Sequence, residues 1–522
     1  MENLELLQIQ PLKRSSHLPE TGTASHIHDV LRPELREARE RMAAQSFFES
    51  YLQANITASD ILQRHHQFID EFRSHAPRKT TVECCDGRVF GRKRAGYPPG
   101  VVSSVHTDGA NIDVSPSNKD LRTRINDSVI DARRNTPGMP ALFIAGGHRS
   151  DHEGMGCAAH HCNDDHALHA ILKQSHELRQ SYKKQNINSD SLYILGGMTN
   201  TDDMTETLHF PDGNILSTAQ IIEDLGLTEP SEVFSSSFLS RPLDDEAIQQ
   251  ATKGLPAGEL LHGNEALMYR DLEIGIAMEV YLMREISAFC NHSEAEAGGA
   301  NTTIHPDVYR MVQSKLDAVM GLPKGLRGPL LYQILWNIAY GVYQRKFVAS
   351  MEEDQRRQYL DHGEDLVCYG NGFRTLPRNS CIHVTPGRGN DAHALTVAKK
   401  VLLKNRSHRP QLHKPLAHIN IEVPGAVNSC EEFRQVESTA MTMKEILSEV
   451  FEDEVHLLTT YSHKNQMRFY PIRLHESDTR ECLGAGITDS MRQQDFHEHG
   501  LNVKETQYTF AMRARMMTSR DP

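Results

Sequence analysis

Two short stretches of this sequence carry the side chains best suited to bind a metal ion. The first is Cys84-Cys85-Asp86-Gly87-Arg88, and the second runs from the glycine pair before His148 to Cys157. Two thiolates and one imidazole are ligands that zinc prefers, and three protein ligands leave the fourth tetrahedral position open for water, as in catalytic zinc sites. The residue types therefore predict a zinc centre that activates water.

The first stretch follows a predicted strand. Residues 79–83 are β-prone, so Cys84 stands at the carboxyl end of a strand, where open α/β sheets keep their sites. Residues two apart on an extended chain point the same way, so Cys84, Asp86 and Arg88 are expected to converge, whereas Cys85 points away as a bystander thiol. We expect Arg88 to keep Asp86 ionised and turned from the metal, and Asp86 to accept a hydrogen bond from the metal's water.

The second stretch offers two candidate ligand pairs. The apolar run 141–145 predicts a buried parallel strand, and His148 follows its Gly-Gly end. The loop beyond it contains His148 with Cys157 and, as a rival pair, His152 with Cys162. The rigid strand end favours His148, and His160 is a candidate for supporting a ligand or carrying a proton. Asn163 is expected to cap a helix to about residue 184, with these residues facing inward: Ala167, Leu168, Ile171 and Leu172.

Taken together, these motifs resemble the zinc site of the β-class carbonic anhydrases, and more narrowly that of the carboxysomal (carboxysome shell) branch of that class. In that branch the spacing from the histidine to the second cysteine is long, and this cysteine opens a Cys-Ala-Ala-His segment such as residues 157–160. The resemblance covers roughly residues 78 to 475 and includes the segments 192–203, 208–212 and 369–373. It implies one Zn²⁺ per chain, held by Cys84, His148 and Cys157, with Asp86 and Arg88 as the catalytic pair.

The same resemblance implies a function and a fold. The function is the reversible hydration of CO2 to bicarbonate, with supply of CO2 to Rubisco in a carboxysome as one setting. The expected α/β fold has a β-carbonic-anhydrase-like parallel-sheet catalytic domain and a degenerate, catalytic-like C-terminal α/β domain. The predicted division is a flexible tail (1–32), a short helical N-terminal region (33–77), the zinc catalytic domain with a helical insertion (78–362) and the degenerate C-terminal domain (363–522).

Expected partners follow from the same comparison of motifs. They are CO2 and bicarbonate, Rubisco or carboxysome shell proteins, and a second copy of the chain in a homodimer or higher homo-oligomer. The location is expected to be the carboxysome or the cytoplasm. The N-terminal region is shorter than the helical domain of that branch, which leaves both locations open.

Periodic patterns predict further elements outside the metal motifs. Helices are expected over residues 265–290 and 326–346, and a β-α-β unit over 416–423, 439–451 and 455–462. No second Cys-x-Asp-x-Arg occurs in that unit, so the last domain is expected to lack a metal. The basic run at residues 91–94 is predicted to be a solvated surface loop, with a rim that attracts bicarbonate as the alternative.

Composition excludes several functional classes. A net charge of −13 argues against a nucleic-acid-binding protein, which needs a basic face. Polar residues interrupt the apolar stretch 328–348, so no membrane span is predicted. Nine cysteines without a short disulfide framework favour a reducing compartment.

Two other functions fit the same residues. One is a non-catalytic, zinc-stabilised carboxysome scaffold that binds its partners through residues 1–32. The other is a thiol enzyme in which Cys84 is the nucleophile, activated by a neighbouring histidine.

Overall fold

The structure is a computed structural model. It describes residues 76–233 with short gaps at 85, 87, 90, 98–101 and 112–118, residues 304–353, residue 52 and shorter segments between 356 and 472. The predicted tail (1–32), the helix at 265–290 and the end of the predicted C-terminal domain (473–522) lie outside the described residues. So does the predicted helical region 33–77, apart from Leu52, Ala76 and Pro77.

The catalytic region predicted from sequence contains a mixed sheet with a parallel centre. Within the described residues its strand order is β6-β5-β4-β3-β1-β2-β7. The four central strands pair in parallel: β1 (Lys79–Cys84), β2 (Val102–Thr107), β3 (Ala141–Arg149) and β4 (Leu192–Asn200). Three shorter strands pair antiparallel: β5 (Glu206–His209), β6 (Ile215–Ser217) and β7 (Tyr369–Gly370). The predicted α/β class with a mostly parallel sheet is confirmed.

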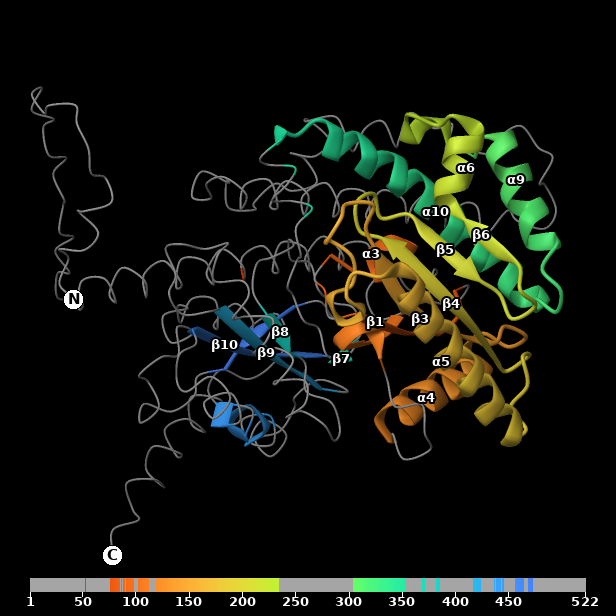
Figure 1. Ribbon diagram of the computed structural model, residues 1–522. Coiled ribbons are helices and arrows are strands. Elements are labelled where there is room, and N and C mark those ends of the chain that lie inside the picture. The colour runs from red at the N-terminus through yellow and green to blue at the C-terminus, as the bar shows by residue number, and fades with distance from the viewer. Residues whose placement is uncertain are drawn as a thin grey trace, which may run out of the picture.

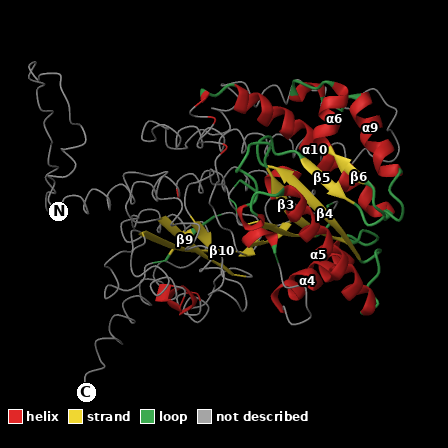
Figure 2. Ribbon diagram, viewed as in Figure 1, coloured by secondary structure: helices red, strands yellow, loops and turns green. Residues whose placement is uncertain are grey.

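Helices cover both faces of this sheet, as Figures 1 and 2 show. One face is covered by α4 (Lys119–Asn135) and α5 (Asp164–Lys184), which enclose an apolar core with Val82, Phe143 and Ile194. The other is covered by α6 (Thr218–Leu225), α9 (Pro306–Asp317) and α10 (Lys324–Ala349), which enclose a larger core. Burial on both faces explains why β3 and β4 read as nearly continuous apolar runs. The short helices are α3 (Gly91–Ala95), η2 (Asp108–Ala110), η3 (Ala158–His160) and η4 (Pro230–Glu232).

The order of the strands creates a crevice between β1 and β3. From β1 the chain adds β2 on one side, then crosses back to build β3 and β4 on the other. After β1 it turns toward the α10 side, where Ala95 and Tyr97 join the larger core, and after β3 it turns toward α5 on the opposite face. Such a reversal of strand order leaves a gap outside the carboxyl ends of the two strands, where open α/β sheets bind ligands. Cys84 and His148 stand at this gap.

Helix α5 begins and packs largely as the sequence predicts. Asn163 is its N-cap, and its side chain accepts a hydrogen bond from the His166 backbone N–H at 2.9 Å. Ala167 and Ile171 are buried and Leu168 is partly buried, as predicted. Leu172 is 38% exposed and lies at the edge of this face, with its Cδ2 3.3 Å from an ideal Cβ on Gly196 of β4. An ideal Cβ on Gly147 would lie 2.8 Å from Met198 Sδ and 3.1 Å from Ile171 Cγ1, so glycine lets α5 approach β3 just before His148.

Helix α10 extends the predicted helix 326–346 at both ends. Two of the polar side chains that interrupt its apolar sequence are buried and paired: Gln333 donates to Glu206 Oε2 at 3.0 Å, and Asn337 donates to the Met204 carbonyl at 2.9 Å. Among the helices of the described residues, none combines the length and apolar character needed to cross a bilayer.

A second sheet lies in the C-terminal part of the chain. Its strand order among the described segments is β11-β10-β9-β8. β9 (Leu416–Val423) coincides with the predicted strand and β10 (His456–His463) is shifted by one residue, with β8 (Ile382–Val384) and β11 (Tyr470–Pro471) at the edges. Residues 438–442 are helical and overlap the start of the helix predicted over 439–451. The parallel pairing of β9 with β10 confirms the predicted β-α-β order.

Candidate metal centre

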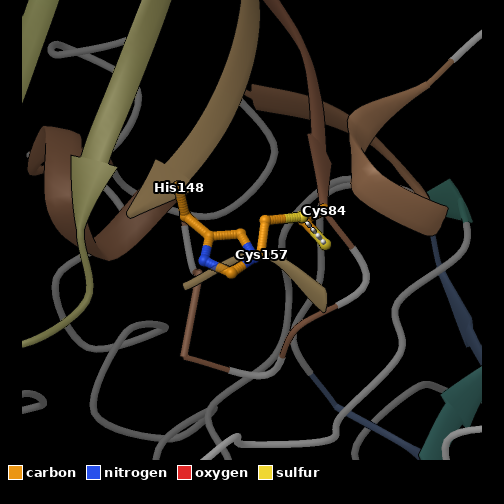
Figure 3. Close-up of side chains that lie close together, drawn as sticks. All are labelled: Cys84, His148 and Cys157. Carbon is orange, nitrogen blue, oxygen red and sulfur yellow. Dashed lines mark hydrogen bonds between the residues drawn. The ribbon is translucent and has the colours of Figure 1, made fainter. Parts of the chain in front are cut away.

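Three of the predicted ligands meet at the gap between β1 and β3. Cys84 is the last residue of β1, His148 lies next to the end of β3, and Cys157 directly precedes η3. Figure 3 shows the three side chains close together, and their ligand atoms all lie within 4.8 Å of one another. All three are at least 95% buried. This group could bind a metal ion.

His148 offers the clearest sign of a missing partner. Both of its ring nitrogens, Nδ1 and Nε2, are buried without a hydrogen-bond partner in the structure. A buried polar atom without a partner is costly, whereas Asp86 and Arg88 beside His148 are paired with each other. A metal ion coordinated by one ring nitrogen would satisfy that nitrogen.

Asp86 and Arg88 form a tight pair beside the three ligands. Arg88 donates from Nη2 to Asp86 Oδ2 at 2.6 Å and from Nε to Asp86 Oδ1 at 3.0 Å, and its backbone N–H also donates to Oδ1 at 2.9 Å. These contacts leave Asp86 Oδ2 3.8 Å from His148 Nε2. The pair converges as predicted, but Arg88 lies in a turn closed by the bond from Val89 N–H to the Asp86 carbonyl, not on an extended chain.

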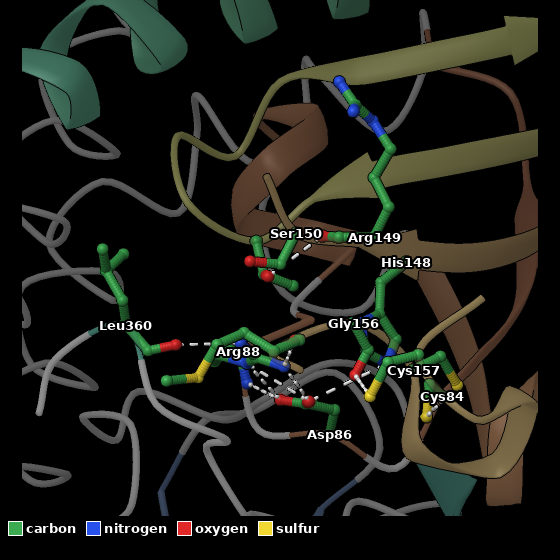
Figure 4. A network of polar contacts seen from close by, with 12 residues as sticks. Cys84, Asp86, Arg88, His148, Arg149, Ser150, Gly156, Cys157 and Leu360 are labelled. Atoms are coloured by element: carbon green, nitrogen blue, oxygen red, sulfur yellow. Dashed lines mark hydrogen bonds and ion pairs between the residues drawn. The ribbon is translucent and has the colours of Figure 1, made fainter. Parts of the chain in front are cut away.

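Arg88 also joins two distant parts of the chain to the site (Figure 4). Its Nη1 donates to the Leu360 carbonyl at 2.9 Å, and its Nη2 donates to the Met155 carbonyl at 2.8 Å. All three guanidinium nitrogens therefore have a hydrogen-bond partner, which holds the group in one orientation. Because Arg88 is 1% exposed, it also fixes the direction of the Asp86 carboxylate without competition from solvent.

The charges in the site shift its pKa values in opposite directions. Burial alone would raise the pKa of Asp86, but the charges of Arg88 and His148 outweigh it and the net pKa is lowered. Burial would lower the pKa of His148, but the negative charges of Cys84 and Asp86 raise it overall. The contact with Cys84 and burial both raise the pKa of the Cys157 thiol. A cation among these groups would favour the thiolates and neutral imidazole instead.

The rival ligand pair is not brought to the site. The His152 side chain is 56% exposed and its Nδ1 lies 3.1 Å from Asp202 Oδ2. Cys162 is only partly buried, and its thiol donates to the Gly154 carbonyl at 3.2 Å. Neither belongs to the buried group formed by Cys84, His148 and Cys157.

The two remaining candidates in these motifs are His160 and Cys85. His160 Nε2 is 3.0 Å from the Gly109 carbonyl, so this side chain joins η3 to η2. Its backbone N–H donates to the Cys157 carbonyl at 3.0 Å, which supports the position of that ligand. Cys85 lies outside the described residues.

The basic run at residues 91–94 is not the surface loop that was predicted. It forms α3, and Arg94 is 1% exposed. Arg94 Nη2 lies 3.1 Å from Glu83 Oε1 and 3.2 Å from Glu206 Oε1, so two carboxylates from the sheet pull this arginine inward. Sequence reasoning missed this network because its members come from three separate segments, and only the position of Glu83 in a predicted strand hinted at it.

Sequence reasoning also missed Asp202, which lies in the segment 192–203 that forms part of the resemblance. Its carboxylate contacts three consecutive residues after β3: Ser150, Asp151 and His152. The two aspartates after a predicted strand were the available signal.

Comparison with known proteins adds no assignment to this geometry. No protein-family model matches the chain, and no curated protein is significantly similar to it. A functional argument for this chain therefore rests on the residues of the candidate metal centre and on their surroundings.

Proposed function

We propose that this chain is a zinc-dependent carbonic anhydrase that catalyses the reversible hydration of CO2 to bicarbonate. The observation that carries the proposal is the buried convergence of Cys84, His148 and Cys157 beside a carboxylate held by an arginine. Three protein ligands leave one tetrahedral position free. The carboxylate of Asp86 lies beside this group, with Oδ2 3.8 Å from His148 Nε2.

Zinc fits the donor set. The two thiol sulfurs of Cys84 and Cys157 are 3.9 Å apart. Zinc–sulfur bonds of about 2.3 Å at a tetrahedral angle place two sulfurs about 3.8 Å apart, whereas a disulfide holds them about 2 Å apart. Two soft thiolates and an imidazole also favour zinc over magnesium or calcium, which prefer oxygen ligands.

When bound, zinc would supply a Lewis acid that lowers the pKa of water towards about 7, as documented for carbonic anhydrases with three histidine ligands. The residues around the metal position would orient the reacting groups. Arg88 occupies both oxygens of Asp86 and keeps the carboxylate ionised, so Asp86 can accept a hydrogen bond and orient the attacking oxygen. The burial of the site suits a substrate as small and apolar as CO2.

The finer identity is part of the same proposal. The motifs at residues 84–88 and 157–160 support a β-class enzyme of the carboxysomal type, and the central parallel sheet is compatible with it. On this proposal the C-terminal sheet belongs to a degenerate copy of the catalytic domain. Rubisco or shell proteins are then the proposed partners, a homodimer or higher homo-oligomer the proposed assembly, and the carboxysome or the cytoplasm the proposed location.

The decisive experiment combines elemental analysis of the purified protein with stopped-flow CO2 hydration. We expect about one zinc per chain and hydration that a chelator abolishes and added zinc restores. One zinc without hydration would favour the scaffold function. Full activity in a reduced sample without zinc would overturn the metal centre and favour the thiol enzyme, although Cys84 is only 5% exposed and poorly placed to meet a large substrate.

A further inference from the structure

The segment between two of the proposed ligands is long enough to need its own support. Residues 149–156, here named the ligand loop, join His148 to Cys157. Each residue of a free loop adds conformational entropy that metal binding would have to overcome. A ready-made metal site therefore requires contacts that hold this loop in place before the metal arrives.

Asp202 supplies contacts to the first half of the ligand loop. Its Oδ1 accepts from Ser150 Oγ at 2.8 Å, and its Oδ2 accepts from the Asp151 backbone N–H at 2.6 Å. The same Oδ2 lies 3.1 Å from His152 Nδ1. The Asp202 side chain is 11% exposed, although Asp151 and His152 face solvent. The acceptor is an ionisable carboxylate, and hydrogen bonds to a charged acceptor are stronger than bonds between neutral groups.

The neighbours of Asp202 reinforce the same contact. Thr201 donates from its backbone N–H to the Arg149 carbonyl at 2.9 Å and from Oγ1 to the same carbonyl at 3.0 Å. Asn200, the last residue of β4, donates to Asp151 Oδ2 at 2.6 Å. The end of β4 and the turn after it are therefore hydrogen-bonded to the start of the ligand loop.

The second half of the ligand loop is held from other directions. Arg88 donates to the Met155 carbonyl at 2.8 Å, and the Cys162 thiol donates to the Gly154 carbonyl at 3.2 Å. The ligand loop is thus held by hydrogen bonds in both halves. Asp202 is the residue that contacts three consecutive loop residues. Figure 4 shows Arg149 and Ser150 where the chain leaves His148.

We propose that Asp202 is a positioning residue of the metal centre, which holds the ligand loop in the geometry that lets His148 and Cys157 reach the same ion. The inference rests on the metal binding of the proposed function and not on the reaction. Removal of groups that orient metal ligands typically costs about 10- to 100-fold in metal affinity. A loss of this size is expected when the Asp202 carboxylate is removed.

The test compares Asp202→Ala and Asp202→Asn with a matched control, Asp212→Ala. Asp212 occupies another turn of the same sheet and accepts comparable bonds, from the Asn214 backbone N–H at 3.0 Å and from the Met320 backbone N–H at 2.6 Å. Among the described residues its hydrogen-bond partners are Asn214 and Met320, neither of which belongs to the ligand loop. Zinc affinity is measured by competition with a chromophoric chelator, and the thermal stability of each metal-free protein is measured alongside.

We expect Asp202→Ala to bind zinc about 10- to 100-fold more weakly than the parent and Asp202→Asn to lie between them, while Asp212→Ala keeps the parent affinity. The cobalt-substituted Asp202 variants should show a changed visible spectrum, which reports the coordination geometry and not the stability of the fold. If Asp202→Ala does not fold, Asp202→Asn and Ser150→Ala carry the test.

Equal zinc affinity and equal cobalt spectra in the parent and the Asp202 variants would overturn the positioning role. So would an affinity loss that Asp212→Ala reproduces, because that would reflect general destabilisation of the sheet. These results would leave the proposed function intact. A parent protein that binds no zinc would overturn both, and a parent that binds zinc without CO2 hydration would overturn only the enzyme function.

Discussion

Asp86 Oδ2 lies 3.8 Å from His148 Nε2, and the same oxygen accepts a 2.6 Å bond from Arg88 Nη2. A carboxylate oxygen is thus placed next to a proposed metal ligand but is directed by an arginine. This arrangement gives Asp86 a role beside the metal ion, as a hydrogen-bond acceptor, and not as a ligand of it.

Replacing Asp86 should separate catalysis from metal binding. We expect Asp86→Ala to lower CO2 hydration by about 10²- to 10⁴-fold, the usual worth of a positioned proton acceptor, while zinc content stays near one per chain. Replacing Arg88 should also lower the rate of CO2 hydration, because Asp86 would lose the partner that orients it. Stopped-flow hydration with elemental analysis tests both variants, and a parent-like rate in Asp86→Ala would remove this residue from the mechanism.

Replacing a proposed ligand should remove the metal itself. Cys84→Ser, His148→Ala and Cys157→Ser are each expected to lose most bound zinc, since each removes one of three ligands. The rival pair provides the matched control: His152→Ala and Cys162→Ser should keep zinc near the parent level. Zinc loss in the second set, with retention in the first, would reassign the ligands.

Lys79 should give the protein a measurable dependence of stability on alkaline pH. Burial lowers the pKa of Lys79 to about 8, against its ordinary value of 10.5. Between these values the unfolded chain binds the proton and the native protein does not, so the free energy of unfolding linked to Lys79 rises with pH. It should rise by about 3 kcal/mol in total across the window, while below it the cost of burying the charge applies in full.

Urea unfolding of the parent and of Lys79→Met at about pH 7 and about pH 10 measures this contribution as a difference between the two proteins. The difference should move in favour of the parent at the higher pH. The exposed Lys183, replaced in the same way, should leave the pH dependence of the parent unchanged. An identical pH dependence in the parent and Lys79→Met would contradict the lowered pKa.

Gly147 should resist even the smallest side chain. Its ideal Cβ would lie 2.8 Å from Met198 Sδ and 3.1 Å from Ile171 Cγ1, so Gly147→Ala must displace the Met198 side chain and crowd Ile171 of α5, at a cost of about 1–3 kcal/mol. The shift is next to His148, so zinc affinity should fall as well. Gly328 in α10 is the control, since an added Cβ meets nothing within 4 Å there and alanine favours helix. Thermal unfolding of both variants measures the two effects. An equal loss of stability in Gly147→Ala and in the Gly328 variant would refute the packing argument.

Local patterns predicted much of the scaffold correctly because they depend on neighbours in the chain. Alternation and β propensity located β1 and β9, and the cap at Asn163 located the start of α5. The inward face of α5 was less well predicted at its edge, where Leu172 is 38% exposed. Helical periodicity indicates a face but not how far the neighbouring sheet extends under it.

The burial of Arg94 shows what such patterns miss. A run of basic residues normally faces solvent, but here Glu83 and Glu206 draw Arg94 into the core from different strands. The energy of a buried charge depends on partners in space, and those partners are far apart in sequence.

The amino-acid sequence by itself identified the ligand types, the Asp86–Arg88 pair and the strand ends that carry Cys84 and His148. It left two possible pairs of ligands in the loop after β3, because the spacing of residues in a loop does not determine which side chains point inward. The tertiary structure brings only one of these pairs to Cys84: His148 and Cys157 are buried beside it, whereas His152 is exposed beside Asp202. Strand order determines which loop residues face the gap between β1 and β3, and strand order arises only when distant segments pack together.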